Sequence, residues 1–368
     1  MRNSYKKGDF LKGVSNFFNS IKNSFFHLIT VISKNKIEGN AIIYYIVFVV
    51  FFLLVSPLII YFCLNETSDK STKEYLIEEN VIIKNPISIN VYSSKEGKNK
   101  KIDLEEYVYG VVSAEMPANF EIEALKSQAV AARTYALSKK VNKCANSKGA
   151  DICDTVHCQV YMNKEERFKG WGNKAKNYWD KIVQAVDYTK GVVLTYNNEL
   201  VLNPQFFAIS SGKTEDNKDV FASNIPYLKS VDSPGEEIAP KFKSVVKFSY
   251  NDFVNKINST YKKAKMKNSD VKSQVKIVSR TDGGGVEKVH LGKISISGVE
   301  FRKLFNLNSS NFSIKFNSND IEILCKGYGH GVGMSQWGAN VMAKNGEKFD
   351  NILTHYYTGV KLVNINKK

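Results

Sequence analysis

The feature that most constrains how this chain can fold is a run of 24 residues without a charged side chain, at positions 41–64 (AIIYYIVFVVFFLLVSPLIIYFCL). As a helix this run would extend about 36 Å, at about 1.5 Å per residue, which is enough to cross a hydrocarbon layer about 30 Å thick. It is too long for the apolar part of a signal peptide, and no small-residue cleavage site follows it. The sequence therefore predicts a transmembrane helix at 41–64 rather than a buried core helix.

The charges around this run predict its orientation. Residues 1–40 hold seven Lys and Arg against two Asp and Glu, a net charge of +5. Because basic segments stay in the cytoplasm, we expect residues 1–40 to be cytoplasmic, 65–86 to be a polar tether and 87–368 to form an extracytoplasmic domain. The whole chain carries +16, which leaves +11 for the outer part. That charge suits a polyanionic cell wall, and the outer location excludes nucleic acid as a partner.

The pattern of the outer part predicts an α+β fold, a compact mixture of helices and strands. Apolar residues at helical spacing indicate a helix from Asp103 to Pro117 and a second one over about 121–140. Turn residues between β-prone runs predict hairpins at 191–210 and 275–297. Residues 312–327 indicate two more strands, and EGKNKK (96–101) is typical of a turn. Two further helices are expected at about 334–344 and 350–357. Residues 236–325 are a possible smaller subdomain.

Glu115 is the first candidate for chemistry. It continues the apolar stripe of the 103–117 helix and lies close to the C-terminus of that helix. Desolvation and the negative end of the helix dipole would both raise the pKa of its carboxyl group. A general acid that works near neutral pH needs such a pKa. The alternative is a glutamate that turns to solvent at a frayed helix end.

Other polar residues accompany this candidate acid. Lys126 and Arg133 share one face of the second helix, either as its solvated side or as contacts for a substrate. In the stretch GYGHGVGMSQ (327–336), glycines alternate with larger residues. Such a loop would let backbone approach a ligand closely, and His330 and Gln336 would add polar groups suited to carbohydrate. A phosphate loop is excluded because no Gly-Lys-Ser/Thr follows.

Three cysteines cluster with one histidine in CANSKGADICDTVHC (144–158). Cys153 and His157 are four residues apart, a spacing at which a thiolate and an imidazole can share a zinc ion. The alternatives are a disulfide among Cys144, Cys153 and Cys158, which an extracytoplasmic location permits, or free thiols. The paired C-x₂-C spacing of a closed four-ligand site is missing, so these alternatives stay open.

Three separate segments resemble one known family. AEMPANFEIEALKSQAVAARTYAL (114–137), FFAISSGKTEDNKDVFASNIPYLKSVDSP (206–234) and GYGHGVGMSQWGANVMA (327–343) are similar to stage II sporulation protein D, in the family's order. The resemblance implies a mixed α/β domain with a long substrate groove. It also implies lytic transglycosylation of peptidoglycan, in which the MurNAc–GlcNAc β-1,4 bond is cleaved and a 1,6-anhydro end is left.

The resemblance also implies roles for individual residues. Glu115 matches the family's catalytic acid, and some members hold a structural zinc ion through residues that match Cys153 and His157. The residues that match its groove are Lys126, Arg133, Ser210, Ser211, Gly212, Tyr227, Lys229 and His330. The family acts on septal wall during engulfment, on glycan strands freed of stem peptides, together with an amidase (stage II sporulation protein P) and a membrane scaffold (stage II sporulation protein M).

Two other functions remain open from the sequence. A non-catalytic wall-binding module that activates a partner amidase would explain the charge of the outer part equally well. A zinc-dependent hydrolase centred on Cys153 and His157 is the third interpretation, and removal of the metal would then abolish activity while leaving the fold intact.

Overall fold

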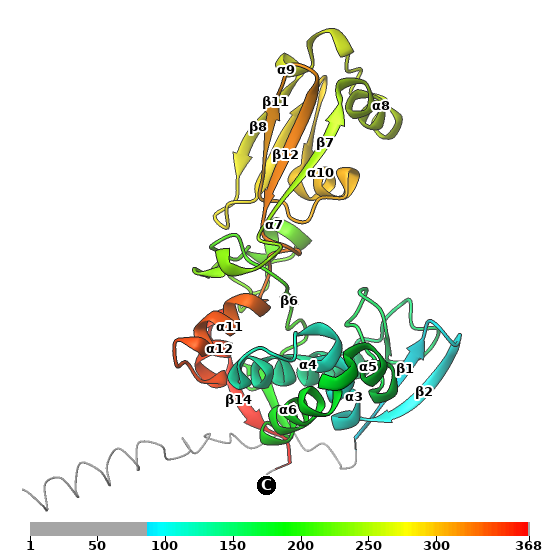
Figure 1. Ribbon diagram of the computed structural model, residues 1–368, viewed down its shortest axis with the longest axis vertical. Helices are drawn as coiled ribbons and strands as arrows, with labels where there is room; N and C mark the ends of the chain where they lie inside the picture. The colour runs from blue at the N-terminus through cyan, green and yellow to red at the C-terminus, as the bar shows by residue number, and fades with distance from the viewer. Residues whose placement is uncertain (1–86, 367–368) are drawn as a thin grey trace, which may run out of the picture. The chain divides into compact units, whose positions relative to one another are not determined.

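The computed structural model describes residues 87–366, which belong to one compact unit of the chain, Tyr75–Lys368. Within the described residues, no helix combines the length and apolar character needed to cross a membrane. The predicted cytoplasmic segment 1–40, membrane helix 41–64 and tether 65–86 lie outside the described residues. The predicted α+β class is confirmed for the part that is described, where helices and small sheets are mixed (Figure 1).

The helices vary from short 3₁₀ turns to the twenty residues of α4. Their bounds are α3 Leu104–Glu115, α4 Ile122–Val141, α5 Lys164–Trp171, η1 Gly172–Lys174, α6 Ala175–Tyr188, α7 Asn217–Phe221, η2 Glu236–Ile238, α8 Tyr250–Thr260, η3 Asn268–Asp270, α9 Val271–Gln274, α10 Gly298–Phe305, α11 Gln336–Lys344 and α12 Phe349–Tyr356.

The strands are short and form several small sheets. Their bounds are β1 Ser88–Ser93, β2 Lys98–Asp103, β3 Ile152–Cys153, β4 Val192–Tyr196, β5 Glu199–Leu200, β6 Phe206–Phe207, β7 Lys243–Ser249, β8 Val275–Arg280, β9 Val286–Leu291, β10 Ile294–Ser297, β11 Phe312–Phe316, β12 Asp320–Lys326, β13 Met334–Ser335 and β14 Lys361–Asn364. The strand orders are β2-β1-β3, β10-β9-β8, β11-β12-β7, β13-β6 and β14-β4-β5.

The predicted local elements agree well with these bounds. Asp103 caps α3 by accepting hydrogen bonds from the backbone N–H groups of Glu105 and Glu106, and α3 ends just before Pro117. The two predicted hairpins and the two further strands at 312–327 are confirmed. In the Asn197-Asn198 turn both residues have positive φ, as the mirror-image hairpin turns require. The predicted turn EGKNKK is wrong in its second half, because residues 98–101 continue as β2 and pair with β1.

The central helix of the first hydrophobic core is α4. It contacts α3, α6, α11, α12 and β4 (Figure 1), and every residue from Glu123 to Ser138 is buried. Alanines on several sides of α4 allow these neighbours to pack closely around it. An amphipathic helix would keep one polar face in solvent, so the polar residues of α4 need partners inside the protein.

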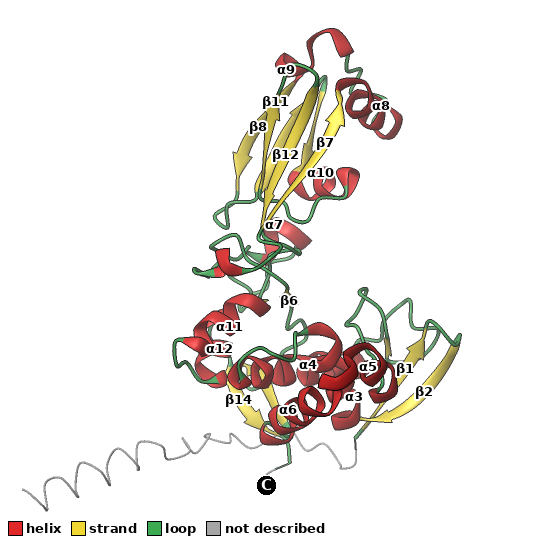
Figure 2. Ribbon diagram, in the orientation of Figure 1, coloured by secondary structure: helices red, strands yellow, loops and turns green. Residues whose placement is uncertain are grey.

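A second hydrophobic core belongs to residues 253–325. It gathers apolar residues of α8, α10 and the strands of the sheets β10-β9-β8 and β11-β12-β7 (Figure 2). Four phenylalanine rings pack together there: Phe253 stacks on Phe305, Phe301 stacks on Phe312, and the rings of Phe301 and Phe305 meet at a tilt. This core fits the predicted smaller subdomain at 236–325, whose bounds stay a prediction.

Candidate functional site

Glu115 is the last residue of α3, where the chain turns away before Pro117. Its side chain is partly buried, and its Oε1 accepts a hydrogen bond of 2.5 Å from the backbone N–H of Val160. Burial raises the pKa of the Glu115 carboxyl group, and the hydrogen bonds from Val160 and from the side chain of Gln336 oppose that rise only in part. The residue therefore combines a tendency to hold a proton with contact to solvent, as a general acid must.

Gly110 allows Val160 to reach this carboxylate. A Cβ atom at Gly110 would lie 2.3 Å from Cε2 of Tyr161 and 2.7 Å from the backbone oxygen of Met162. Such distances are far below van der Waals contact, so any side chain at position 110 would push the segment 160–162 away from α3. Gly110 and Val160 could not be predicted from the sequence. Val160 acts through its backbone N–H, which every residue type except proline has, and the close contact at Gly110 is indicated only by a glycine within a helix.

Gln336 is the first residue of α11 and is almost fully buried, at 6% exposure. Its side chain forms a hydrogen bond with Glu115, and its Nε2 donates to Oε1 of Gln128 over 3.3 Å. Gln128 is completely buried on α4, and its Nε2 has no hydrogen-bond partner among the described residues. Gln336 therefore contacts the candidate acid, with Gln128 behind it, and its predicted contact with substrate stays a prediction.

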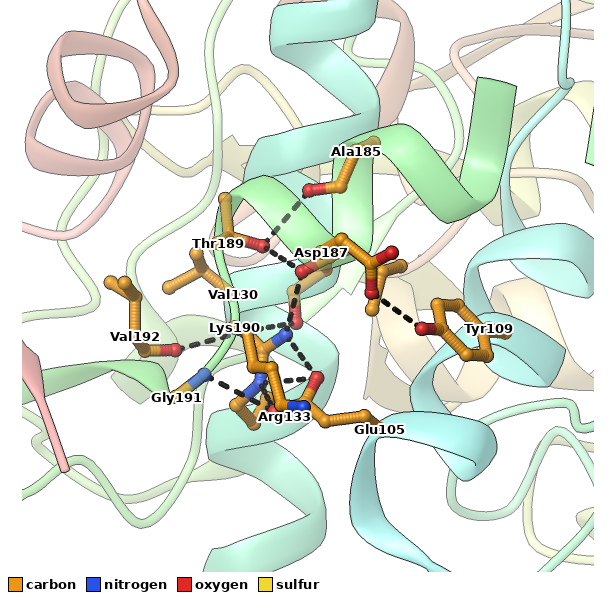
Figure 3. A network of polar contacts seen from close by, with 12 residues as sticks. Glu105, Tyr109, Val130, Arg133, Ala185, Asp187, Thr189, Lys190, Gly191 and Val192 are labelled. Atoms are coloured by element: carbon orange, nitrogen blue, oxygen red, sulfur yellow. Dashed lines mark hydrogen bonds and ion pairs between the residues drawn. The ribbon is translucent and has the colours of Figure 1, made fainter. Parts of the chain in front are cut away.

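Arg133 does not line a groove. Its side chain is fully buried, with Nη2 2.6 Å and Nε 2.9 Å from the carboxylate oxygens of Glu105, and Nη1 donates to the backbone oxygen of Val192 over 3.0 Å (Figure 3). Glu105 also accepts from the N–H of Gly191. The predicted substrate contact is therefore wrong for Arg133, which joins α4 to α3 and to the start of β4.

Lys126 is likewise part of the packed interior. It is 8% exposed, its Nζ lies 2.8 Å from Oε1 of Glu123, and it stands 3.5 Å from the centre of the Tyr188 ring. The second oxygen of Glu123 accepts from the backbone N–H of Phe349. The prediction that Lys126 contacts substrate is also corrected, for the same reason as for Arg133: α4 has no solvated face at these positions.

The glycine-rich loop packs closely against the segment 205–215 of the same chain. A Cβ at Gly333 would lie 2.1 Å from the backbone oxygen of Gln205, and one at Gly329 would lie 2.8 Å from Cβ of Phe207. The loop forms bridges to the 209–215 segment, Ile209 with Tyr328 and Glu215 with Val332. These glycines let two family-like segments pack backbone to backbone, and the expectation that they also admit a ligand stays a prediction.

His330 lies in this loop between the rings of Phe207 and Phe221, 5.7 and 5.4 Å away. Its Nδ1 accepts from the N–H of Val332, and burial lowers its pKa to about 4. His330 is therefore neutral at physiological pH. It shares a small cavity with Ser210 and Ser211, so the structure brings these three predicted residues together, away from the hydrogen bonds of Glu115.

The remaining predicted groove residues have partners in the protein. Ser210 is 2% exposed, and Ser211 accepts from the amide of Asn311 over 2.9 Å. Gly212 has a φ of 117°, which favours glycine. Tyr227 is buried against Tyr196, with ring centres 5.4 Å apart. Lys229 is partly exposed, and its Nζ lies 3.3 Å from a carboxylate oxygen of Asp216. It therefore places a positive charge near the surface.

Glu236 is a buried carboxyl group that sequence analysis missed. It accepts from the hydroxyls of Ser233 and Ser335, both over 2.6 Å, and from the N–H of Ser210 over 2.8 Å. Burial raises the pKa of Glu236 from its ordinary 4.5 to about 7, against the effect of these hydrogen bonds. It thereby joins the two family-like segments that follow α4, 206–234 and 327–343.

The cysteine cluster is a candidate metal site of four ligands. Cys144, Cys153, His157 and Cys158 bring their ligand atoms within 4.8 Å of one another, about twice a Zn–S bond length of about 2.3 Å. Their Sγ and Nδ1 atoms are separated by 3.3 Å for Cys144 and His157 and by 4.0 Å for Cys144 and Cys153. All three cysteines are free thiols. The residues therefore fit a Cys₃His metal site, which adds Cys144 and Cys158 to the predicted pair.

Comparison with known proteins agrees with the segments described above. A family model described as Stage II sporulation protein matches residues 92–196, which include Glu115 and the cysteine cluster. Stage II sporulation protein D of Bacillus subtilis (strain 168) is 39% identical over 300 residues, which cover 81% of this chain and 85% of that protein. The protein of the same name from Bacillus amyloliquefaciens is 39% identical over 286 residues, 77% and 81% of the two chains.

A more distant relative carries a different name. The amidase enhancer of Bacillus subtilis (strain 168) is 28% identical over 303 residues, which cover 69% of this chain and 40% of that protein. The stage II sporulation proteins D are more similar and align with the present chain over most of both lengths. The chain therefore belongs to the stage II sporulation protein D family.

Proposed function

We propose that this chain is a lytic transglycosylase of peptidoglycan, which cleaves the MurNAc–GlcNAc β-1,4 bond and leaves a 1,6-anhydro-MurNAc end. The observation that carries the proposal is the environment of Glu115. A carboxyl group that is partly desolvated, yet partly open to solvent, holds its proton at a higher pH than an exposed glutamate does. Membership of a sporulation family supports the same assignment.

The reaction can proceed with a single carboxyl group. Protonated Glu115 donates its proton to the glycosidic oxygen as the bond from that oxygen to the anomeric carbon breaks. The C6 hydroxyl oxygen of the same MurNAc residue then attacks the anomeric carbon, and its proton returns to the Glu115 carboxylate. No water is consumed, and the intramolecular attack gains from a high effective concentration. Glycosidases that use water generally need a second carboxylate.

The neighbours of Glu115 serve its two protonation states. Val160 N–H and the Gln336 amide stabilise the carboxylate that remains after proton donation, while burial favours the acid. Because Glu115 must start protonated, we expect activity to fall as pH rises through its elevated pKa.

We also propose that the metal site holds a structural zinc ion. Zinc bound by four protein ligands keeps no open position for a substrate, in contrast to catalytic zinc, which argues against a zinc-dependent hydrolase. Bound zinc would supply cross-linking of the 144–158 segment. Cys158 stands two residues before Val160, so the same ligands would fix the start of the segment that donates to Glu115.

A non-catalytic module that activates an amidase is the second candidate, because a relative of this chain is named an amidase enhancer. Incubation of the full-length chain with glycan strands, without any amidase, discriminates the two. Release of anhydro-muropeptides is expected for an enzyme. Binding without release would refute the enzymatic proposal and favour the module.

The place of action is part of the proposal. We propose a single-pass membrane protein with its N-terminus in the cytoplasm and its catalytic domain facing the septal wall during engulfment. Stage II sporulation proteins P and M would be its partners, and stem-peptide-free glycan its substrate. The uncharged run at 41–64 and the basic segment before it support this arrangement.

A further inference from the structure

The α5–α6 hairpin carries aromatic rings and cations beside the segment that contacts Glu115. The guanidinium carbon of Arg167 lies 4.2 Å from the centre of the Trp171 ring, and that ring meets Tyr178 edge-on at 5.6 Å. Lys164 stands 5.3 Å from the ring of Phe168. The aromatic residues of this hairpin are only partly buried, so a ligand in solvent can reach them.

Arg167 lacks a negative partner. Its Nε is buried without any hydrogen-bond partner among the described residues, and no carboxylate within residues 87–366 lies within ion-pair distance of it. Its Nη1 contacts only a weak acceptor, the sulfur of Met162, at 3.6 Å. The neighbouring Glu166 is engaged elsewhere, with Lys95 at 2.9 Å. A guanidinium that is partly desolvated and unpaired is costly unless an anion joins it, and burial indeed lowers the pKa of Arg167.

The position of Arg167 connects it to the candidate acid. Met162, which touches its guanidinium, follows Val160 by two residues, a span of at most about 7 Å. Val160 donates directly to Glu115. On α6, the Nζ of Lys181 donates to the backbone oxygen of Phe120, just beyond α3. The hairpin therefore borders the segments on both sides of Glu115.

We propose that Arg167 and Trp171 form a subsite for a carboxylate-bearing sugar, namely a MurNAc residue whose lactyl carboxylate is free. The planar guanidinium matches a carboxylate with two parallel hydrogen bonds, and the indole ring offers a flat apolar surface to the sugar. A stem peptide converts that carboxylate into a neutral amide and removes its charge. Arg167 is thus a residue that determines specificity for denuded strands, an inference that rests on the proposed function.

Binding, measured apart from turnover, tests this inference. Full-length protein with the Glu115→Gln substitution, solubilised in mild detergent, is titrated calorimetrically with denuded glycan strands and with the same strands after methylamidation of their lactyl carboxylates. We expect about tenfold or greater preference for the free acid, as one charge-assisted interaction supplies. Adding Arg167→Gln should remove the preference and leave affinity for the amidated strands unchanged.

Lys169→Gln is the matched control, because it removes the same charge from an exposed position of α5. It should keep the preference, and thermal unfolding checks that each variant folds. If Arg167→Gln does not fold, Arg167→Lys keeps the charge without the guanidinium fork and should weaken the preference. Full preference in either Arg167 variant, or none in the parent, overturns the inference. The reaction products of the wild-type protein are measured in a separate experiment. The binding preference can therefore still be interpreted if the proposed reaction is not observed.

Discussion

The buried carboxyl group of Glu236 predicts how stability depends on pH. Its pKa is raised from 4.5 in the unfolded chain to about 7 in the folded protein. The folded state therefore holds this proton more tightly than the unfolded state does. The contribution to stability is fully present below about pH 4.5 and is lost as pH rises through about 7.

The size of this effect follows from the two pKa values. A difference of about 2.5 pKa units at about 1.4 kcal/mol per unit gives about 3–4 kcal/mol. A whole domain is stable by only about 5–15 kcal/mol, so the loss should be measurable. In the variant Glu236→Gln the side chain cannot titrate. An amide oxygen at the Oε2 position can still accept from Ser210 N–H and the Ser335 hydroxyl, and the amide N–H₂ at the Oε1 position can donate to the Ser233 hydroxyl oxygen.

Denaturant unfolding of both proteins between pH 5 and pH 8, followed by near-UV circular dichroism, measures this contribution. From pH 5 to pH 8 the unfolding free energy of the wild type should fall by about 2–3 kcal/mol relative to that of Glu236→Gln, because most of the titration of Glu236 lies in this range. Glu237→Gln, at the exposed neighbouring position, should titrate like the wild type. A difference between wild type and Glu236→Gln that stays constant across this range would refute the reasoning.

Three further predictions follow from the packing around the site. Gly110→Ala should sharply reduce turnover with little loss of fold, since its Cβ displaces the segment that bonds Glu115; Gly170→Ala, which meets nothing within 4 Å, should leave turnover unchanged. Arg133→Met should lower the unfolding free energy by about 3 kcal/mol, because it leaves the partly buried Glu105 carboxylate without its cation. A loss below about 1 kcal/mol would contradict the assignment. Cys144→Ser should lower both the zinc content of the protein, measured by elemental mass spectrometry, and its melting temperature. A zinc content equal to that of the control variant Gly170→Ala would count against the four-ligand site.

Local structure was readable from the sequence, and burial was not. Asp103 and Pro117 fixed the limits of α3 because caps and breakers act over a few residues. The interior position of α4 could not be predicted, because Lys and Arg residues on one face of a helix usually indicate a solvent-exposed face. In the structure α3, α6, α11 and α12 surround this helix. The neutralising partner of Arg133, Glu105, is 28 residues away and unmarked by any spacing.

The site shows the same division. Glu115 could be predicted from one stripe of α3, whereas Val160 and Gln336 reach it from distant segments through backbone and side-chain contacts that no local pattern encodes. Two of the four candidate metal ligands, Cys153 and His157, could be predicted from their spacing. Cys144 and Cys158 lack paired spacing, and the turns on either side of β3 bring them to Cys153 and His157, with Cys144 N–H donating to the backbone oxygen of Asp151 and Cys158 N–H to that of Thr155.

The central claim, that Glu115 donates the proton that breaks the glycan, is tested most directly by one product mass spectrum. Denuded strands are incubated separately with wild-type protein, with Glu115→Gln and with Glu121→Gln, a substitution at an exposed position nearby. The masses of the soluble fragments are then measured. Fragments lighter by one water than hydrolysis products should come from wild type and Glu121→Gln and be absent with Glu115→Gln. Undiminished anhydro fragments from Glu115→Gln would contradict the account.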